Sequence, residues 1–343
     1  MNNCSWSFFL PGQRIQQNKP NVHGENKSGH LVLPPYPKII LPMKNIIILL
    51  FLLTGPALFA QRTDSVRNGN TQIYYELKGK GTPIYILAGG PGLTPYYLRP
   101  VVDELSKSNL CVLIHQRGTG LTRFTPTKGM NYIEEFSQDI ELVRQKLAHP
   151  HITLLGHSWG GMLAMHMAVS FPKAVSKLIL VSSGGYNLGF LSYFKDNIYS
   201  ALSLEDQQRI AEQGSPITGS TAAGKKLNAA QLLEIMSRGY VYNKTTAAQI
   251  RLGAADINQF SGDEVWKSLA AAHWDLSEKL KALKCPALIL QGRQDPIDLQ
   301  TAEMIKTKIS GSQLQVIEQC GHFPWLEQPK IFYPSISSFL AKP

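Results

Sequence analysis

A single serine lies between closely spaced glycines in the segment LLGHSWGG, residues 154–161. Its hydroxyl is either the nucleophile of an enzyme or an ordinary turn residue. The pattern Gly-x-Ser-x-Gly arises by chance in roughly one chain in ten of this length, so its spacing alone does not decide. The context favours a nucleophile, because we expect a buried strand before Ser158 and a helix directly after it. The helix N-terminus would then favour negative charge developing beside Ser158.

A serine hydroxyl is a weak nucleophile until a base accepts its proton. His322, in the segment QCGHFPWLEQP, follows the last strand that we expect, and Asp295, in LQGRQDPID, follows the strand before it. The order serine, acid, histidine along the chain is that of one known arrangement of the hydrolytic triad. We therefore predict that His322 is the base and that Asp295 orients it, with Asp298 as the alternative acid.

Acyl transfer also requires N–H groups that bind the negatively charged oxygen of the tetrahedral intermediate. The segment LAGGPG, residues 87–92, follows the first long buried strand, where backbone N–H groups approach a substrate carbonyl. We assign the oxyanion hole to the N–H groups of Gly90 and Trp159, and a plain turn is the alternative for this segment. No Cys/His pair has the spacing of metal ligands, so we expect no metal, and acyl transfer by these groups implies no cofactor.

Alternating strands and helices would bring these residues together. Short runs rich in Ile, Val and Leu predict buried strands that begin at Ile84, Leu110, Ile152, Lys177, Ala287 and Leu314. Helical patterns occupy the intervals 132–147, 159–170, 299–309 and 329–340. Strands that are apolar on both faces indicate a mostly parallel sheet covered by helices, an α/β fold. The segment TQIYYELKG, from Thr71, alternates and predicts an antiparallel edge strand of a hairpin.

This alternation stops between residues 186 and 273, where the pattern is mostly helical and contains no buried-strand run. We expect this segment to be an inserted helical lid over one edge of the sheet. The core would then comprise residues 61–185 and 274–343.

The segment MKNIIILLFLLTGPALFAQ, residues 43–61, has the features of a secretory signal peptide that is cleaved after Ala60. Its apolar run is shorter than the roughly 20 residues that cross a bilayer, and an uncleaved membrane anchor is the alternative. Because signal peptides begin at the N-terminus, we expect residues 1–42 to be a spurious extension from a misassigned start codon, with Met43 as the true start. The mature protein would be periplasmic or extracellular.

The composition describes a chain that can bury a large core, with 43% hydrophobic and 17% charged residues among 343. The first 60 residues hold five Lys or Arg and one Glu, so they contribute +4 of the formal charge of +10. The other basic residues are scattered, which argues against nucleic-acid binding. The mature chain would keep Cys111, Cys285 and Cys320, an odd number that predicts no disulfide framework.

Three segments together resemble those of a known family. Residues 89–92 (GGPG), 116–120 (QRGTG) and 156–161 (GHSWGG) are similar to segments of the proline iminopeptidase group of serine peptidases, within the α/β-hydrolase superfamily. The resemblance extends from about Thr71 to Leu340. It implies an α/β-hydrolase fold and removal of N-terminal proline from short peptides.

The chain departs from this family at a few positions. Ala88 and His115 stand where members often have His and Asp, respectively. The family binds the substrate's free amino group with lid carboxylates, but Gln259, in the segment NQF, replaces the expected Glu. A neutral amide loses charge-assisted pairing with an ammonium. Other lid acids are candidate substitutes: Glu205, Asp206, Glu234, Asp256 and Glu264.

Further residues carry weaker predictions. Gln259 and Trp274 are candidate substrate contacts. Trp266, Trp274 and Trp325 could each line an apolar pocket, with packing in the core as the default for all three. His157 should pack away from the site, and Arg117 should order its own loop.

The sequence therefore predicts a serine hydrolase that acts on short peptides as an aminopeptidase or, alternatively, on small esters as a carboxylesterase. A non-catalytic binding protein on the same scaffold is a third reading. The expected partner is a small-molecule or short-peptide substrate, with a membrane only if the signal segment is retained. Neither the natural substrate nor the oligomeric state follows from the sequence.

Overall fold

The computed structural model describes residues 61–125, 127, 130–212 and 227–342. The expected extension at 1–42 and signal peptide at 43–60 lie outside the described residues. None of the described helices is both long and apolar enough to cross a membrane.

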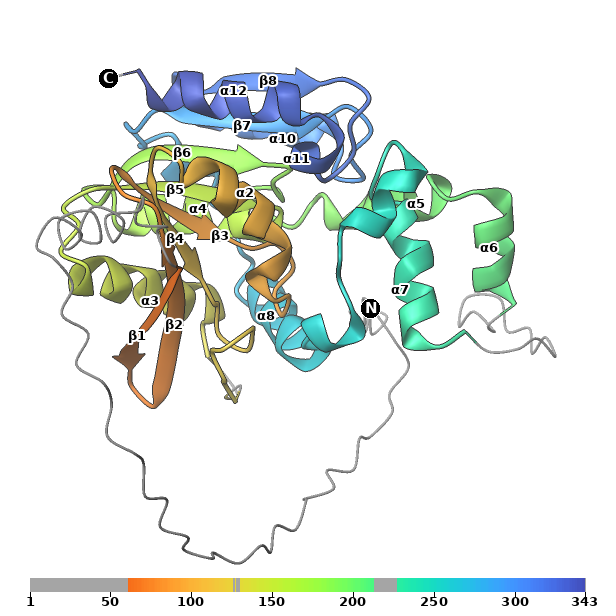
Figure 1. Cartoon of the computed structure of the whole chain (residues 1–343), viewed down its shortest axis with the longest axis horizontal. Helices are drawn as coiled ribbons and strands as arrows, with labels where there is room; N and C mark the ends of the chain where they lie inside the picture. The colour runs from red at the N-terminus through yellow and green to blue at the C-terminus, as the bar shows by residue number, and fades with distance from the viewer. Residues whose placement is uncertain (1–60, 126, 128–129, 213–226, 343) are drawn as a thin grey trace, which may run out of the picture. The chain divides into compact units, whose positions relative to one another are not determined.

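Within the described residues, eight strands form one sheet in the order β1-β2-β4-β3-β5-β6-β7-β8 (Figure 1). Their bounds are β1 Arg62–Asn68, β2 Thr71–Lys78, β3 Pro83–Leu87, β4 Leu110–Ile114, β5 Ile152–His157, β6 Val175–Val181, β7 Ala287–Gly292 and β8 Gln313–Ile317. Strand β2 runs antiparallel to both β1 and β4, and all remaining neighbours are parallel. The prediction of a mostly parallel sheet is confirmed.

One edge of the sheet differs from the prediction. Strand β2 is not the outermost strand, because β1 pairs with it from Arg62 opposite Leu77 to Asn68 opposite Thr71. The sequence of β1, RTDSVRN, has no apolar run, and its residues are exposed or half-buried. Hydrophobic periodicity finds strands that bury at least one face, so it misses an edge strand of this kind.

Helices cover both faces of the sheet. Helices α2 (Arg99–Leu105) and α12 (Pro329–Leu340) share a hydrophobic cluster with Ile84 and Ile86 of β3. The alternate residues of β3 point to the other face, where they join a second cluster. Helices α3 (Tyr132–Lys146), α4 (Trp159–Ser170) and α10 (Leu299–Lys308) contribute to that second cluster. The four helical patterns predicted from the sequence lie within one residue of these observed bounds.

The long segment between β6 and β7 is mostly helical in its described residues, with turns and loops between the helices. It contains α5 (Leu191–Ser200), α6 (Leu204–Ala211), α7 (Ala229–Arg238) and α8 (Gln259–Ala271), with the short 3-10 helices η2 (Lys244–Gln249) and η3 (Ala254–Asp256). We call residues 186–212 and 227–273, which carry these elements, the lid. Figure 1 shows α5, α6 and α7 together to the side of the sheet. Further short helices are η1 (Pro95–Leu98), α9 (Ser277–Leu280) and α11 (Pro324–Glu327).

Candidate active site

Ser158 stands at a sharp turn between β5 and α4, which we call the elbow (residues 156–161). Its backbone has φ 56° and ψ −121°, a conformation that L-residues rarely adopt. Such a residue costs on the order of 1–3 kcal/mol and persists only where its surroundings impose it. Here the Ser158 N–H donates to Val181 O (3.0 Å), and Ser158 O accepts from the N–H groups of Gly161 (2.9 Å) and Gly184 (3.1 Å).

The glycines of the elbow are required by close backbone contacts. A Cβ atom on Gly156 would lie 2.2 Å from Gly160 O, and one on Gly160 would lie 2.2 Å from Leu87 O. Neither neighbour is a flexible side chain, so neither can yield easily. Helix α4 can therefore approach the end of β3 only with these glycines.

His322 and Asp295 form a buried pair at the carboxyl edge of the sheet. His322 Nδ1 lies 2.9 Å from Asp295 Oδ1 and 3.1 Å from Oδ2. Since a carboxylate only accepts, Nδ1 carries the proton and Nε2 is left as an acceptor. Asp295 Oδ1 also accepts from the Ile297 N–H (2.8 Å), which fixes the carboxylate. Asp298 instead caps α10 by accepting from Thr301 N–H (3.0 Å).

The loops that carry the acid and the base are bonded to each other. Gln294 N–H donates to Cys320 O (2.9 Å), and Cys320 N–H donates to Gln294 Oε1 (3.1 Å). A Cβ atom on Gly292 would lie 2.1 Å from Gly321 O, so these two loops are in close contact. The residues after β7 and β8 thus reach one place, as the sequence predicts for neighbouring parallel strands.

The backbone N–H groups of Gly90 and Trp159 have no hydrogen-bond acceptor among the described residues. Trp159 is the first residue of α4, so its N–H has no partner inside the helix. The N–H of Gly90, whose φ is 52°, is likewise unbonded, whereas Gly89 N–H donates to Tyr97 Oη (2.6 Å). Gly90 and Trp159 therefore retain the donors that an oxyanion requires.

Contacts of Gln116 explain why the segments QRGTG and GGPG occur together in this chain. Gln116 Nε2 donates to Ala88 O (2.9 Å), and its Oε1 accepts from the Trp159 indole N–H (2.8 Å). One side chain thereby links the loop of Gly90 to the elbow. Arg117 donates to both carboxylate oxygens of Asp139 (2.6 and 2.8 Å), so it orders its own loop, as predicted.

His115, one of the departures from the family pattern, contacts groups within the fold. Its Nδ1 accepts from Leu121 N–H (3.0 Å), and its Nε2 lies 3.3 Å from Glu76 Oε1. Both side chains are buried. The departure at position 115 thus joins β4 to β2 and lies outside the cavity described next.

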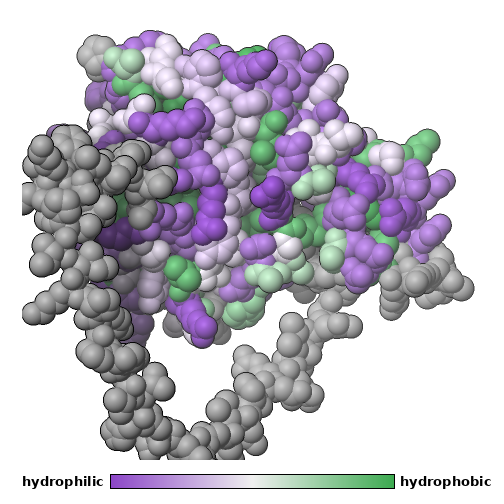
Figure 2. Space-filling view, in the orientation of Figure 1, coloured by the Kyte–Doolittle hydropathy of each residue, from purple (hydrophilic) through white to green (hydrophobic). Residues whose placement is uncertain are grey.

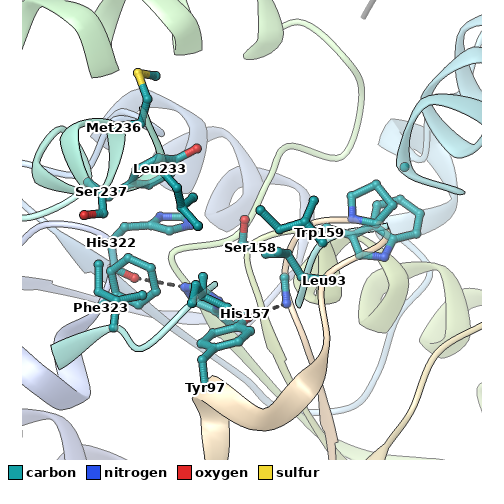
Figure 3. Close-up of a pocket in the computed structure, with 18 of the residues that line it drawn as sticks. Leu93, Tyr97, His157, Ser158, Trp159, Leu233, Met236, Ser237, His322 and Phe323 are labelled. Atoms are coloured by element: carbon teal, nitrogen blue, oxygen red, sulfur yellow. Dashed lines mark hydrogen bonds between the residues drawn. The ribbon is translucent and has the colours of Figure 1, made fainter. Parts of the chain in front are cut away.

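A cavity of about 330 Å³ opens above the elbow and contains every reactive group described so far except Asp295. Ser158, His322, Gly90 and Trp159 line it on the sheet side. Figure 3 shows the Ser158 hydroxyl and the His322 ring facing the same space, with His157 below both in this view. The lid completes the cavity with mostly apolar side chains: Leu191, Phe194, Leu233, Met236, Ile250, Leu252 and Trp266.

The remaining predicted contacts divide between the cavity and the core. Gln259 lines the cavity. Trp274 does not, because it is buried in the hydrophobic cluster shared with α3 and α4. Trp266 lines the cavity, whereas Trp325 packs beside Tyr97 in the hydrophobic cluster that includes α2 and α12. His157 also reaches the cavity, although we expected it to point away.

Most of the lid acids proposed from the sequence are engaged elsewhere. Asp206 and Glu264 pair with Arg238 and Lys267, respectively (2.7 and 2.8 Å). Asp256 accepts from Thr94 Oγ1 (2.8 Å), and Glu205 is exposed on α6. Glu234 lines the cavity but pairs with Arg238 (2.7 Å).

The sequence analysis missed Asp263. This half-buried carboxylate lines the cavity, accepts from Gln259 Nε2 (2.9 Å), and forms no ion pair within 4 Å among the described residues. Burial raises its pKa, while the amide of Gln259 only partly offsets that effect. The signal was present, since residues four apart on a helix share a face and Gln259 was already a candidate.

No group of three or more His, Cys, Asp or Glu side chains in the described part of the chain is arranged to hold a metal ion. The chemistry available at the cavity is that of a hydroxyl, an imidazole with its carboxylate, and unbonded N–H groups.

Known proteins resemble this chain over most of its length. The model of the α/β-hydrolase fold matches residues 82–329. A proline iminopeptidase of Heyndrickxia coagulans is 26% identical over 271 residues, which covers 78% of this chain and 93% of that protein. A 2-hydroxy-6-oxo-2,4-heptadienoate hydrolase of Pseudomonas putida is also 26% identical, covering 77% and 90%.

Solved structures resemble it in fold. An esterase from Exiguobacterium antarcticum superposes with a TM-score of 0.58 at 20% identity, covering 81% of this chain and 99% of that one. A family match over more than two thirds of the chain accords with the strand order, the elbow and the order of the acid and base loops. The chain belongs to the α/β-hydrolase family.

Proposed function

We propose that this protein is a serine hydrolase that transfers acyl groups to water and acts as an aminopeptidase on short peptides. The observation that carries the proposal is that Ser158, on its strained turn, shares one cavity with His322, whose Nδ1 is bonded to Asp295.

The reaction follows from these groups. His322 Nε2 accepts the Ser158 hydroxyl proton while Oγ bonds to the substrate carbonyl carbon. The N–H groups of Gly90 and Trp159 stabilise the resulting oxyanion, and Asp295 stabilises the imidazolium. His322 then protonates the leaving amine or alcohol as the acyl-enzyme forms. Water, deprotonated by the same histidine, releases the acid and restores Ser158.

Aminopeptidase action is supported by Asp263. A half-buried carboxylate whose partner is an amide attracts an ammonium group, which would lower the cost of its partial burial. Trp266 beside it offers an apolar surface for a proline ring. The proline iminopeptidases among the relatives agree with this assignment.

Covalent labelling and kinetics test the proposal together. We expect a fluorophosphonate to modify Ser158, and a proline anilide or an activated ester to give a burst of acylation. Ser158→Ala should lose both, with turnover lower by at least ~10⁴-fold. A Ser158→Ala protein as active as the wild type would refute the nucleophile, and an unlabelled wild type with no turnover would favour the binding-protein reading.

A carboxylesterase is the second candidate, because the lid wall is mostly apolar and Gln259 is neutral. Three substrates separate the two activities: a proline anilide with a free amino group, the same anilide with its nitrogen acylated, and a short acyl ester. An aminopeptidase should prefer the first to the second by at least ~10-fold. Faster turnover of the ester, with no effect of blocking, would assign the protein as an esterase.

We also propose that the protein is exported after cleavage following Ala60. The support is the arrangement of residues 43–60 alone. N-terminal sequencing of the protein made in a bacterial host should read Gln61-Arg62-Thr63. Recovery of residues 1–42 on the exported protein would contradict both the cleavage and the start at Met43.

A further inference from the structure

A continuous chain of hydrogen bonds connects the three loops of the site beneath the cavity. Gly89 N–H donates to Tyr97 Oη (2.6 Å), Tyr97 Oη lies 2.8 Å from His157 Nδ1, and His157 Nε2 lies 2.9 Å from His322 O. Figure 3 shows His157 between Tyr97 and His322, with a dashed line to the His322 carbonyl. The exposed fractions of Tyr97, His157 and His322 are only 7%, 2% and 3%.

The chemistry of the two ends sets the direction of every bond. The His322 carbonyl can only accept, so His157 Nε2 carries a hydrogen. In a neutral ring Nδ1 is then an acceptor, and it takes the Tyr97 O–H. The Tyr97 oxygen remains free to accept from Gly89 N–H. One tautomer of neutral His157 therefore satisfies all of these polar groups.

Protonation of His157 would disrupt this order, because Nδ1 would become a second donor toward the Tyr97 oxygen. Burial, followed by the nearby charge of His322, keeps the pKa of His157 well below its ordinary value. The two rings are 4.6 Å apart between centroids. A neutral His157 with both ring nitrogens bonded is not the base of the proposed reaction, although it is adjacent to Ser158 in sequence.

Packing encloses the bonded chain. A Cβ atom on Gly89 would lie 2.8 Å from Ser158 Cβ and 3.0 Å from Tyr97 Oη, so only glycine fits there. The rings of Phe323 and Trp325 lie 5.5 and 4.8 Å from the His157 ring. Such an apolar enclosure strengthens hydrogen bonds and makes an unpaired group costly.

We propose that Tyr97 and His157 are positioning residues for the hydrolytic reaction. They hold the peptide of Gly89, and through it the Gly90 N–H, at a fixed place relative to Ser158 and the main chain of His322. Neither touches the reacting atoms in this role. The inference rests on the proposed function, since it assigns a purpose to the geometry of that site.

Tyr97→Phe removes one oxygen and leaves the ring. We expect kcat for an activated ester to fall ~10- to 100-fold with KM within about twofold, because misplaced donors weaken transition-state binding more than substrate binding. Labelling of Ser158 by a fluorophosphonate should slow by a similar factor. The control is Tyr85→Phe, which breaks a partly buried tyrosine–histidine bond, from Tyr85 Oη to His149 Nδ1 (3.0 Å), outside the cavity. The control should keep the wild-type kcat.

Two substitutions of His157 test the two halves of the chain separately. The amide of Gln reaches the Nε2 position and retains a donor to His322 O, whereas Asn reaches only the Nδ1 position and retains an acceptor for Tyr97. We expect each variant to retain more activity than His157→Phe, which loses both bonds. This partial rescue is a result that a role in packing alone does not predict.

The outcomes separate the inference from the function on which it rests. If wild-type Ser158 is labelled but Tyr97→Phe behaves as Tyr85→Phe does, with equal loss of thermal stability and unchanged kcat, the positioning role is wrong and the hydrolase stands. A wild type that is neither labelled nor active refutes the proposed function before any variant is compared.

Discussion

The two walls of the cavity are held together in different ways. The wall at the sheet edge consists of main-chain turns that are hydrogen-bonded to one another, as at Ser158, Gly89 and the pair of Gln294 with Cys320. The lid wall consists mainly of apolar side chains from α5, α7 and α8. Of six strongly exposed large hydrophobic side chains in the described residues, the lid carries four: Tyr199, Leu204, Tyr242 and Phe260.

The surface agrees with this contrast. Figure 2 shows hydrophobic residues among hydrophilic ones over the side of the molecule where Figure 1 places α5, α6 and α7. Hydrogen bonds and close contacts at glycine allow one geometry, while apolar packing tolerates exchange of similar side chains. We infer that the sheet wall determines the reaction and the lid wall determines the substrate.

The largest effect should come from Asp295→Asn on the sheet wall. The substitution preserves shape but removes the charge that selects the tautomer of His322, so kcat should fall by ~10⁴-fold with little change in KM. Steady-state kinetics with an activated ester measure it. Asp298→Asn is the control, because Asn also caps helices well and Asp298 bonds to α10. Equal losses of kcat in the two variants would contradict the assignment of Asp295 alone and support Asp298 as the acid.

A buried histidine on α4, the helix that follows Ser158, should make the free energy of unfolding depend on pH. His166 bonds to Ser137 Oγ (2.8 Å), and burial lowers its pKa from 6.5 to about 4. The folded state thus binds fewer protons than the unfolded state in that interval. The contribution of neutral His166 to the free energy of unfolding is therefore complete above pH 6.5. It decreases as the pH falls toward 4, by on the order of 3 kcal/mol.

Urea denaturation between pH 7 and 4 measures this loss. His166→Gln should flatten the dependence, while His151→Gln, at an exposed site, should leave it unchanged. An unchanged slope in His166→Gln would assign the acid sensitivity to other groups.

A change in the lid wall should alter substrate choice without altering the reaction. Asp263→Asn should lower kcat/KM for a proline anilide with a free amino group ~10- to 100-fold, the value of one charge-assisted hydrogen bond. Turnover of a short acyl ester should be unchanged. Glu264→Gln is the matched control, since Glu264 pairs with Lys267 and does not line the cavity. Equal losses on both substrates would place Asp263 in the structure of the wall.

The smallest effect should come from the segment that joins the two walls. Asn258 N–H donates to Gly92 O (2.8 Å), its side-chain amide donates to Gly118 O (3.0 Å), and its Oδ1 caps α8. Asn258→Ala should cost ~1 kcal/mol of unfolding free energy, as the loss of a cap does. We expect at most a few-fold change in kcat. A larger loss of kcat would show that the lid also orders the loop of Gly90.

The sequence by itself determined the order of elements and the place of each candidate group along it. Buried strands such as β3 and β5 are recognisable as apolar runs, and a glycine pattern after a strand indicates a sharp turn. Both signals arise from residues that are neighbours in the chain. Ser158, Asp295 and His322 could therefore be named, each at the end of a predicted strand. Strand β1 could not, because its partner and not its own apolar content makes it a strand.

Only the tertiary structure decided which side chains meet. The sequence does not distinguish Trp274 from Trp266 as a pocket residue, yet Trp274 lies in the core and Trp266 lines the cavity. Tyr97 bonds to His157, 60 positions later, and His157 bonds to His322 O, 165 positions further on. Contacts between such distant segments depend on how whole strands and helices pack, and no local periodicity encodes them.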